Sequence, residues 1–389
     1  MATTTNEPSA DDKVPFWSLA AAISAIGVSG LGFGHSLPLF SVLLESYGAS
    51  DFEIGLNTAF AAVAALLGSP FYPKLISKWG LRPFLIVALV TMISPYFLVY
   101  FAGDQIIWWY PLRFVFAIGG GALFAGAEIW INAIAPDRIR GRVLGIYATC
   151  LALGFALGPL IFERTGHEGV LPFLAGVATF AAAGLPILFI AAPRISAESQ
   201  GNIFAPMLAA PVLFGSAAMF AGTESAMLIF LPILAMELGH GVSIGAFALT
   251  VYGVGLVVSQ IPVGLLADKY PAGRVMAACA SVGAAFACLI PFVQAEVLML
   301  YAVLFIWGGA VGGIYTAGLV VLGNTYKGEA LAAANTAFVF TYAAGAVIGP
   351  LAAGAARSLF GPDGMIFMIG GVLAFYAVAA VRRSTGEAP

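Results

Sequence analysis

The stretch Leu112–Pro159 reads LRFVFAIGGGALFAGAEIWINAIAPDRIRGRVLGIYATCLALGFALGP. It opens with a long apolar helix that carries two charges, Arg113 and Glu128. We expect this helix to end at Pro136 in a short basic loop, residues 138–142, before a second apolar helix begins. Two apolar helices of this length, joined by a basic loop, indicate a chain that crosses a membrane.

Part of this stretch recurs later in the chain. Gly154, Gly158 and Pro159 are repeated as Gly345, Gly349 and Pro350, each 191 positions on (345−154, 349−158 and 350−159). At the same offset, Ser77-Lys78 maps onto Asp268-Lys269. The sequence therefore predicts two copies of one membrane half.

The composition excludes an ordinary soluble domain. Hydrophobic residues make up 61% of the chain and charged residues 9%, with a mean hydropathy of +0.99, whereas soluble proteins carry about 25% charged residues. The net charge of −3 argues against a nucleic-acid partner. The three cysteines lie in apolar runs and no Cys/His cluster has ligand spacing, so we expect no disulfide framework, metal or cofactor.

The apolar runs predict an all-α membrane protein with twelve transmembrane helices in two pseudo-symmetric six-helix halves, since about 20 residues span a bilayer. In the first half they are expected near 17–45, 52–76, 84–102, 106–134, 141–162 and 170–191. In the second half they are expected near 206–236, 243–266, 274–292, 296–322, 330–355 and 365–382.

Polar segments divide the chain around these helices. Residues 1–15 and 383–389 are predicted to be tails, and residues 193–205 a linker between the halves 16–192 and 206–382. The N-terminal tail lacks a basic region and a cleavage site, so the first helix is expected to remain uncleaved.

The basic residues predict the orientation, because inner loops of membrane proteins are enriched in Lys and Arg. With the N-terminus inside, the inner segments hold Lys13, Lys74, Lys78, Arg82, Arg138, Arg140, Arg142, Arg194, Lys269, Arg274, Lys327, Arg382 and Arg383. That is thirteen of the 16 basic residues. We therefore expect a multi-pass protein of the cell (inner) membrane with both termini cytoplasmic.

Several motifs resemble those of the major facilitator superfamily of secondary transporters. The sequence GLLADK at 264–269, followed by Gly273-Arg274, resembles the superfamily's G-x-L-A-D-R-x-G-R loop. Its first-half copy is degenerate, with Pro73 and Ser77 in place of Gly and Asp. Arg113 followed by glycines at 119–121 is similar to the family's R-x-x-x-x-G pattern. The resemblance covers nearly the whole chain.

A further resemblance concerns the direction of transport. Gly145, Gly154, Gly158 and Pro159 are spaced as in the superfamily's drug/proton antiporters, although the two glycines expected just after them are absent. The resemblance implies a secondary transporter that rocks two halves around a central cavity, and the antiporter-like spacing favours export of an amphipathic organic compound. H⁺ is the expected driving ion, because Glu128, Glu224 and His35 are titratable groups inside predicted spans, and we expect a monomer. Proton-coupled uptake of a small polar or anionic solute is the alternative, and a transport-dead receptor or assembly factor is a remote one.

The sequence gives no indication of an enzyme site. No HExxH or GxSxG arrangement is present, and the predicted partners are a small-molecule substrate, H⁺ and the lipid bilayer.

Charges inside membrane spans are costly, which marks them as candidate functional residues. Arg113 either snorkels outward or, as the resemblance implies, faces the cavity, where it would bind an anionic group or set the pKa of a nearby carboxyl. Glu128 lies about 60° round the same helix from Arg113, so it either faces the same pathway or pairs with an inner-loop arginine. Glu224 and His35 each carry a proton or serve as a hydrogen-bonded core residue. Glu224, Glu128 and His35 are the proton-coupling candidates.

Other polar residues are expected to point away from lipid and to line the substrate cavity together with Arg113. They are Asn57, Asn132, Tyr147, Tyr252, Gln260, Tyr315, Asn335 and Tyr342.

The inner face is predicted to hold a gate. Asp268 would accept hydrogen bonds from the N-terminus of a neighbouring helix and pair with Arg274 or Lys269, unless these charges only set the topology. Gly154 and Gly158 allow close helix packing, and Pro159 is expected to bend its helix. The gate and conformational candidates are Lys78, Arg82, Arg140, Arg142, Gly158, Pro159, Asp268 and Arg274.

Overall fold

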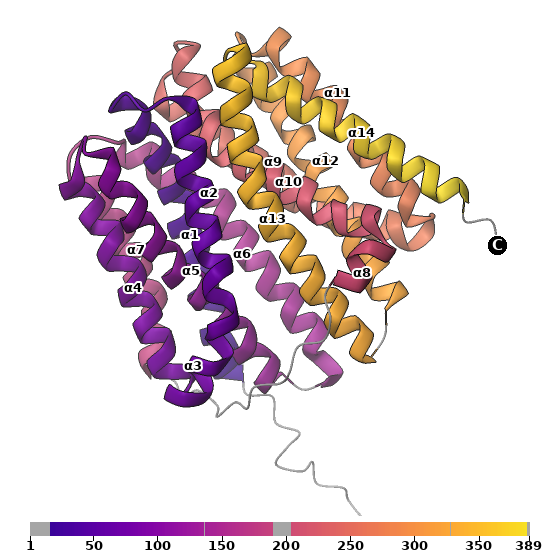
Figure 1. Ribbon diagram of the computed structural model, residues 1–389, viewed down its shortest axis with the longest axis horizontal. Coiled ribbons are helices and arrows are strands. Elements are labelled where there is room, and N and C mark those ends of the chain that lie inside the picture. Colours follow the sequence, from indigo (N-terminus) through magenta and orange to yellow (C-terminus); the bar gives the residue numbers. More distant parts are fainter. Residues whose placement is uncertain (1–15, 136, 190–203, 327, 387–389) are drawn as a thin grey trace, which may run out of the picture.

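The computed structural model describes residues 16–135, 137–189, 204–326 and 328–386, and all regular structure in these residues is helical (Figure 1). The first half contains α1 (Phe16–Ser46), α2 (Asp51–Gly68), the 3-10 helix η2 (Ser69–Phe71), α3 (Tyr72–Trp79), α4 (Leu81–Ala102), α5 (Ile106–Ile134), α6 (Asp137–Thr165) and α7 (Leu171–Phe189). The second half contains α8 (Phe204–Ala209), α9 (Pro211–Glu237), α10 (Gly241–Lys269), α11 (Ala272–Val293), α12 (Val297–Thr325), α13 (Gly328–Phe360) and α14 (Gly364–Gly386).

These helices confirm the prediction of an all-α membrane protein. In the described residues, 11 helical stretches are long and apolar enough to span a bilayer, and a shorter apolar helix covers Leu171–Ile187 in the sixth expected position. The second span is assembled from α2, η2 and α3, which together cover Asp51–Trp79. Length and hydropathy alone therefore located the spans.

The predicted basic loop at residues 138–142 is wrong, because these residues form the first turns of α6. α6 begins at Asp137, directly after a proline in the sequence, and an acidic residue in the first turn stabilises a helix N-terminus. The connection between α5 and α6 is correspondingly short. Pro159 lies inside α6, which remains helical from Asp137 to Thr165.

The repeat seen in the sequence reappears as a repeat of helix contacts. In each half, a glycine-bearing helix packs so closely on its partner that a Cβ atom at the glycine would overlap the partner's backbone, with α6 on α1 and α13 on α9. The contacts are Gly154 with Gly27, Gly158 with Leu31, Gly345 with Ala218 and Gly349 with Gly222. Partners in the second half lie 191 positions after those in the first (218−27 and 222−31). Small residues thus replace the hydrophobic effect as the packing device, as expected in lipid.

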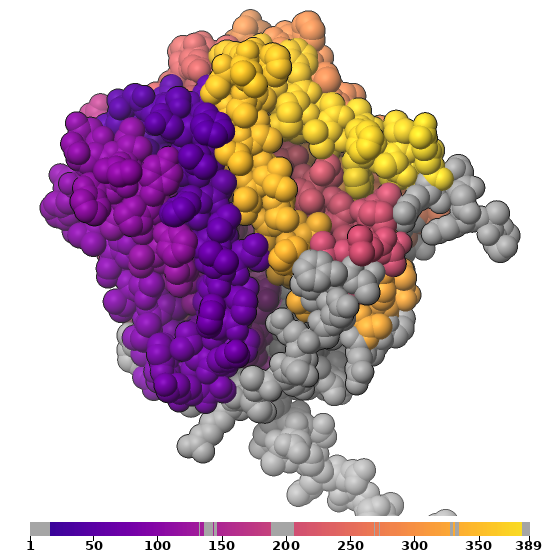
Figure 2. All heavy atoms as spheres, in the orientation of Figure 1, coloured from indigo at the N-terminus to yellow at the C-terminus, as the bar shows by residue number. Residues whose placement is uncertain are grey.

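The two halves stand side by side, with α1–α7 on the left and α9–α14 on the right of Figure 1. Among the described residues, their main contacts are between α2 and α13, between α6 and α10, and between α1 and α9. Figure 2 shows the indigo and gold surfaces of the two halves meeting in the upper part of the view. The α2–α13 and α6–α10 pairs set the shape of the central site described next.

Candidate functional site

Glu224 lies near the middle of α9 and is held by a tyrosine from another helix. The hydroxyl of Tyr342 on α13 donates to Oε2 of Glu224 on α9 at 3.1 Å. Glu224 also lines a cavity of about 30 Å³ between α6, α9 and α10, together with Phe155, Ala156 and Tyr252. A space of this size holds a water molecule. The carboxyl therefore lies at the boundary between the halves, where hydration of the site can change as they move.

Glu128, on α5 of the first half, is the second carboxylate that the sequence singled out. The hydroxyl of Tyr147 on α6 donates to Oε1 of Glu128 on α5 at 3.5 Å, a long separation for an O–H···O bond. Glu128 is exposed, whereas Tyr147 is buried. The pair joins α5 to α6 and leaves the carboxylate accessible to solvent or to a bound molecule.

Tyr315 on α12 lies near both carboxylates. It interacts electrostatically with both Glu128 and Glu224. The centre of its ring lies 4.7 Å from the ring centre of Phe220 and 6.1 Å from that of Tyr342. Glu128, Glu224, Tyr147, Tyr252, Tyr315 and Tyr342 thus form one group, which we call the central site. Two carboxylates with tyrosines around them suit a ligand that has an apolar or aromatic body and donor or cationic groups.

Arg113 lies on α5 outside the central site. Its side chain is 2% exposed, and its guanidinium carbon lies 4.4 Å from the ring centre of Phe40 on α1. Its Nε has no hydrogen-bond partner, and no ion pair to it is seen within the described residues. The buried side chain does not reach the surface, as the snorkelling alternative required. Asn57 on α2 is likewise buried, and its amide atoms are unpaired in the described part of the chain.

His35 is bound inside the first half, away from the central site. Its Nε2 lies 2.8 Å from the carbonyl oxygen of Pro172 at the start of α7, and its ring packs near Phe162. The side chain is fully buried. This geometry matches the alternative of a hydrogen-bonded core histidine.

The remaining candidate residues lie outside the central site, or their side chains lie outside the part of the chain that the structure describes. Gln260 is half-buried and Asn335 is exposed, while Lys78, Arg82 and Arg274 are exposed near the predicted inner face. The side chains of Asn132, Arg140, Arg142 and Asp268 lie outside the described residues. The inner gate built on Asp268 therefore stays a prediction.

Sequence reasoning missed one cluster, which is centred on Arg357 near the end of α13. Its Nε and Nη2 lie 2.8 Å from Asp51 of α2 and 2.8 Å from Glu237 of α9. The sequence marked Arg357 only as a basic residue near a predicted outer end. The ion pairs could have been predicted from the location of the charges, because Asp51 and Glu237 are acidic and also lie at predicted outer ends of their helices.

The described residues form 11 apolar helical spans and one shorter apolar helix in two repeated halves, with a tyrosine-bound carboxylate in each half, as in an integral membrane transporter. The chain belongs to the Major Facilitator Superfamily, whose sequence profile matches residues 22–213 and 212–389. It is accordingly a secondary transporter and not an enzyme.

Similar proteins include the uncharacterised MFS-type transporter YfkF of Bacillus subtilis (strain 168), which is 28% identical over 353 residues, covering 88% of this chain and 90% of that protein. The uncharacterised MFS-type transporter YcaD of Salmonella dublin is 24% identical over 346 residues, covering 87% of this chain and 88% of that protein.

Two solved structures share the fold. The crystal structure of the nucleoside transporter NupG superposes with a TM-score of 0.77 at 13% identity, covering 95% of this chain and 99% of that one. A bacterial homologue of the human lysosomal transporter Spinster, in an inward-facing and unoccupied conformation, superposes with a TM-score of 0.71 at 18% identity, covering 96% and 94%. At these identities the likeness describes the fold alone.

Proposed function

We propose that the protein exports an amphipathic organic compound in exchange for protons, with Glu224 as the proton carrier. The observation that carries this proposal is the position of Glu224, which accepts from Tyr342 beside a cavity between α6, α9 and α10. An ionisable side chain inside a membrane span is expensive to bury and marks a functional site. Because the cavity lies between the halves, rocking of the halves would expose Glu224 to each side in turn.

Tyr342 gives the two protonation states of Glu224 different partners. A phenol hydroxyl that donates at 3.1 Å stabilises the ionised carboxylate, since hydrogen bonds to charged groups are the stronger ones. When Glu224 takes up a proton, the carboxyl gains its own donor and no longer depends on that contact. The position of Tyr342 can therefore change with the proton on Glu224.

Glu128 is proposed to contact the substrate. It is exposed, it accepts from Tyr147, and Tyr315 brings it into electrostatic contact with the Glu224 side of the site. A substrate with a cationic or donor group and an apolar body would satisfy the carboxylates and pack on the tyrosine rings. The direction, export, rests on the antiporter-like spacing of Gly145, Gly154 and Gly158. His35 has no part in this scheme, because Pro172 already engages it.

The test is transport in proteoliposomes with the aromatic cation ethidium as the first probe. Glu224→Gln keeps the shape of the side chain but cannot release a proton. It should abolish accumulation driven by a pH gradient and leave exchange at equilibrium largely intact, because exchange needs only the rocking motion. Glu128→Gln should weaken both. Glu168→Gln, at an exposed position between α6 and α7, is the matched control and should change neither.

Normal pH-driven transport by Glu224→Gln would overturn the assignment, as would coupling to Na⁺. If the wild type moves neither ethidium nor related aromatic cations, the substrate class is wrong.

A second candidate is proton-coupled uptake of a small anionic solute. It is favoured by Arg113, a buried cation with no carboxylate partner in the described residues. Uptake of organic anions that requires Arg113 and a pH gradient would select this candidate over export.

We also propose that the protein works as a monomer, with both termini on the cytoplasmic side of the cell membrane. The orientation is supported by the thirteen basic residues of the predicted inner segments.

A further inference from the structure

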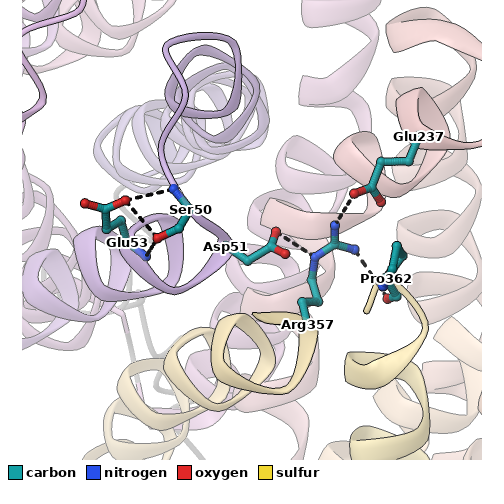
Figure 3. Close-up of polar contacts among 6 residues, drawn as sticks. All are labelled: Ser50, Asp51, Glu53, Glu237, Arg357 and Pro362. Atoms are coloured by element: carbon teal, nitrogen blue, oxygen red, sulfur yellow. Dashed lines mark hydrogen bonds and ion pairs between the residues drawn. The ribbon is translucent and has the colours of Figure 1, made fainter. Parts of the chain in front are cut away.

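Arg357 joins three helices at the predicted outer face (Figure 3). Its Nε donates to Oδ1 of Asp51 at 2.8 Å, its Nη2 donates to Oε1 of Glu237 at 2.8 Å, and its Nη1 donates to the carbonyl oxygen of Pro362 at 3.4 Å. The arginine is 2% exposed. Charge-assisted bonds to a carboxylate on either side hold the guanidinium in one geometry.

These contacts divide unequally between the two halves. Asp51 is the first residue of α2 in the first half, whereas Glu237 on α9 and Pro362 after α13 belong to the second half with Arg357. Separation of the halves at this face would therefore break only the bond to Asp51. Glu237 and Pro362 would keep the guanidinium oriented for the return.

The arginine is needed because the carboxylates here repel one another. Glu45, near the end of α1, interacts electrostatically with Asp51, Glu237 and Arg357. Closing this face brings Glu45 and Asp51 of the first half toward Glu237 of the second half. Repulsion among these like charges disfavours closure of the face. Arg357 is the cation whose attraction to the carboxylates offsets this repulsion.

The backbones under this cluster meet without side chains between them. A Cβ atom at Gly354 on α13 would overlap the carbonyl oxygen of Asp51, and one at Gly55 on α2 would overlap that of Pro350. Helix ends reinforce the charges, since Asp51 lies at the N-terminus of α2 and Arg357 in the last turn of α13. At this face, α2 and α13 are therefore so close that their backbones are in contact.

We propose that Arg357 is a positioning residue of the transport cycle that locks the predicted outer face by binding Asp51. Glu237 and Pro362 hold Arg357 in place, and the bond to Asp51 is released each time this face opens. The lock requires no particular substrate or coupling ion, so its failure would leave the proposed role of Glu224 untouched.

The experiment measures opening of this face in the full-length protein in lipid nanodiscs. Spin labels are placed at Glu168→Cys and Glu296→Cys, two exposed positions at predicted outer ends of different halves, on a background lacking the native cysteines. Double electron–electron resonance then gives the populations of short and long distances. Asp51→Asn removes the bond between the halves and should raise the ratio of long to short distances about tenfold, as expected for a lost charge-assisted hydrogen bond.

Four further variants separate a lock from a merely structural contact. Gly354→Ala, an uncharged wedge, should shift the distances in the same direction as Asp51→Asn. Gly371→Ala is the matched control, because a Cβ atom there meets nothing within 4 Å, and it should leave the distances unchanged. Asp51→Glu, which keeps the charge, should restore most of the short-distance population. Glu237→Gln should have a smaller effect than Asp51→Asn, because its bond lies within one half.

Two results would overturn the proposal. One is an unchanged distance distribution in folded Asp51→Asn protein. The other is an equal shift in Gly371→Ala, which would mean that any substitution opens the face. Neither depends on Arg357 variants, whose folding could suffer from the unpaired carboxylates that they leave behind.

Discussion

Arg113 is buried without a carboxylate partner in the described residues. Replacing it should therefore affect the free energy of unfolding and the transport activity differently. An arginine in the centre of a membrane helix costs at most about 2.5–3.5 kcal/mol on insertion scales. Its contact with the ring of Phe40, at 4.4 Å, returns about 0.5–2 kcal/mol. Burial of Arg113 therefore costs more than its visible contacts return.

Arg113→Met removes the charge and keeps a long flexible side chain that fills the same space. From the two contributions above, we expect the free energy of unfolding to stay the same or rise by up to about 3 kcal/mol. If uptake of an organic anion is the function, that uptake should nevertheless fall sharply, because the anion would lose its buried cationic partner, whereas export of ethidium should be unchanged. Arg113→Lys keeps a charge but cannot stack as a planar group, and it should recover only part of the activity.

The assay pairs unfolding by SDS in mixed micelles with transport in proteoliposomes made from the same preparation. Arg113→Met would contradict this prediction if it lowered the free energy of unfolding by about 2 kcal/mol or more while the folded fraction transported normally. Arg113 would then be a structural residue whose partners keep the first half together.

Two further predictions concern packing and orientation. Gly158→Val and Gly349→Val should each lower the free energy of unfolding by about 1–3 kcal/mol in the same SDS titration, because both overfill equivalent helix contacts. Gly371→Val should lower it less, and equal losses at all three sites would argue against the repeat of contacts. Ser77→Cys should react with an impermeant thiol reagent only from the inside and Glu168→Cys only from the outside of cells. The reverse pattern would overturn the predicted orientation.

The sequence was sufficient to find the helices, because hydropathy over about 20 residues reports directly on membrane spans. It misplaced the start of α6, since the charged residues at 138–142 look like a loop in a hydropathy profile. Charged side chains are tolerated in a helix that extends beyond the apolar region. The backbone there is decided by capping and helix propensity, which hydropathy does not measure.

The candidate site was only partly predictable. The cost of burying charge singled out Glu128 and Glu224, and polarity singled out Tyr147 and Tyr342 as cavity residues. The pairing of these side chains could not be read from the sequence, because the helices are apolar on nearly every face and give no clear direction. The bond from Arg357 to Asp51 joins residues 306 positions apart, in two different halves. No local pattern in the sequence connects them.

The contacts within the halves differ in kind from those between them. Within each half, glycines bring α6 onto α1 and α13 onto α9 at backbone distance, and such contacts cannot slide without breaking close packing. Between the halves, the contact at the predicted outer face also reaches the backbone, but its attraction comes from one guanidinium among three carboxylates. The side chains of Asp51 and Glu237 are 22% and 32% exposed, so water can reach the Asp51 carboxylate when the halves separate, while Glu237 still holds the buried arginine. A rocking mechanism needs rigid halves and a contact between them that can separate. Gly158 and Gly349 provide the close packing within the halves, and Arg357 provides the separable contact between them.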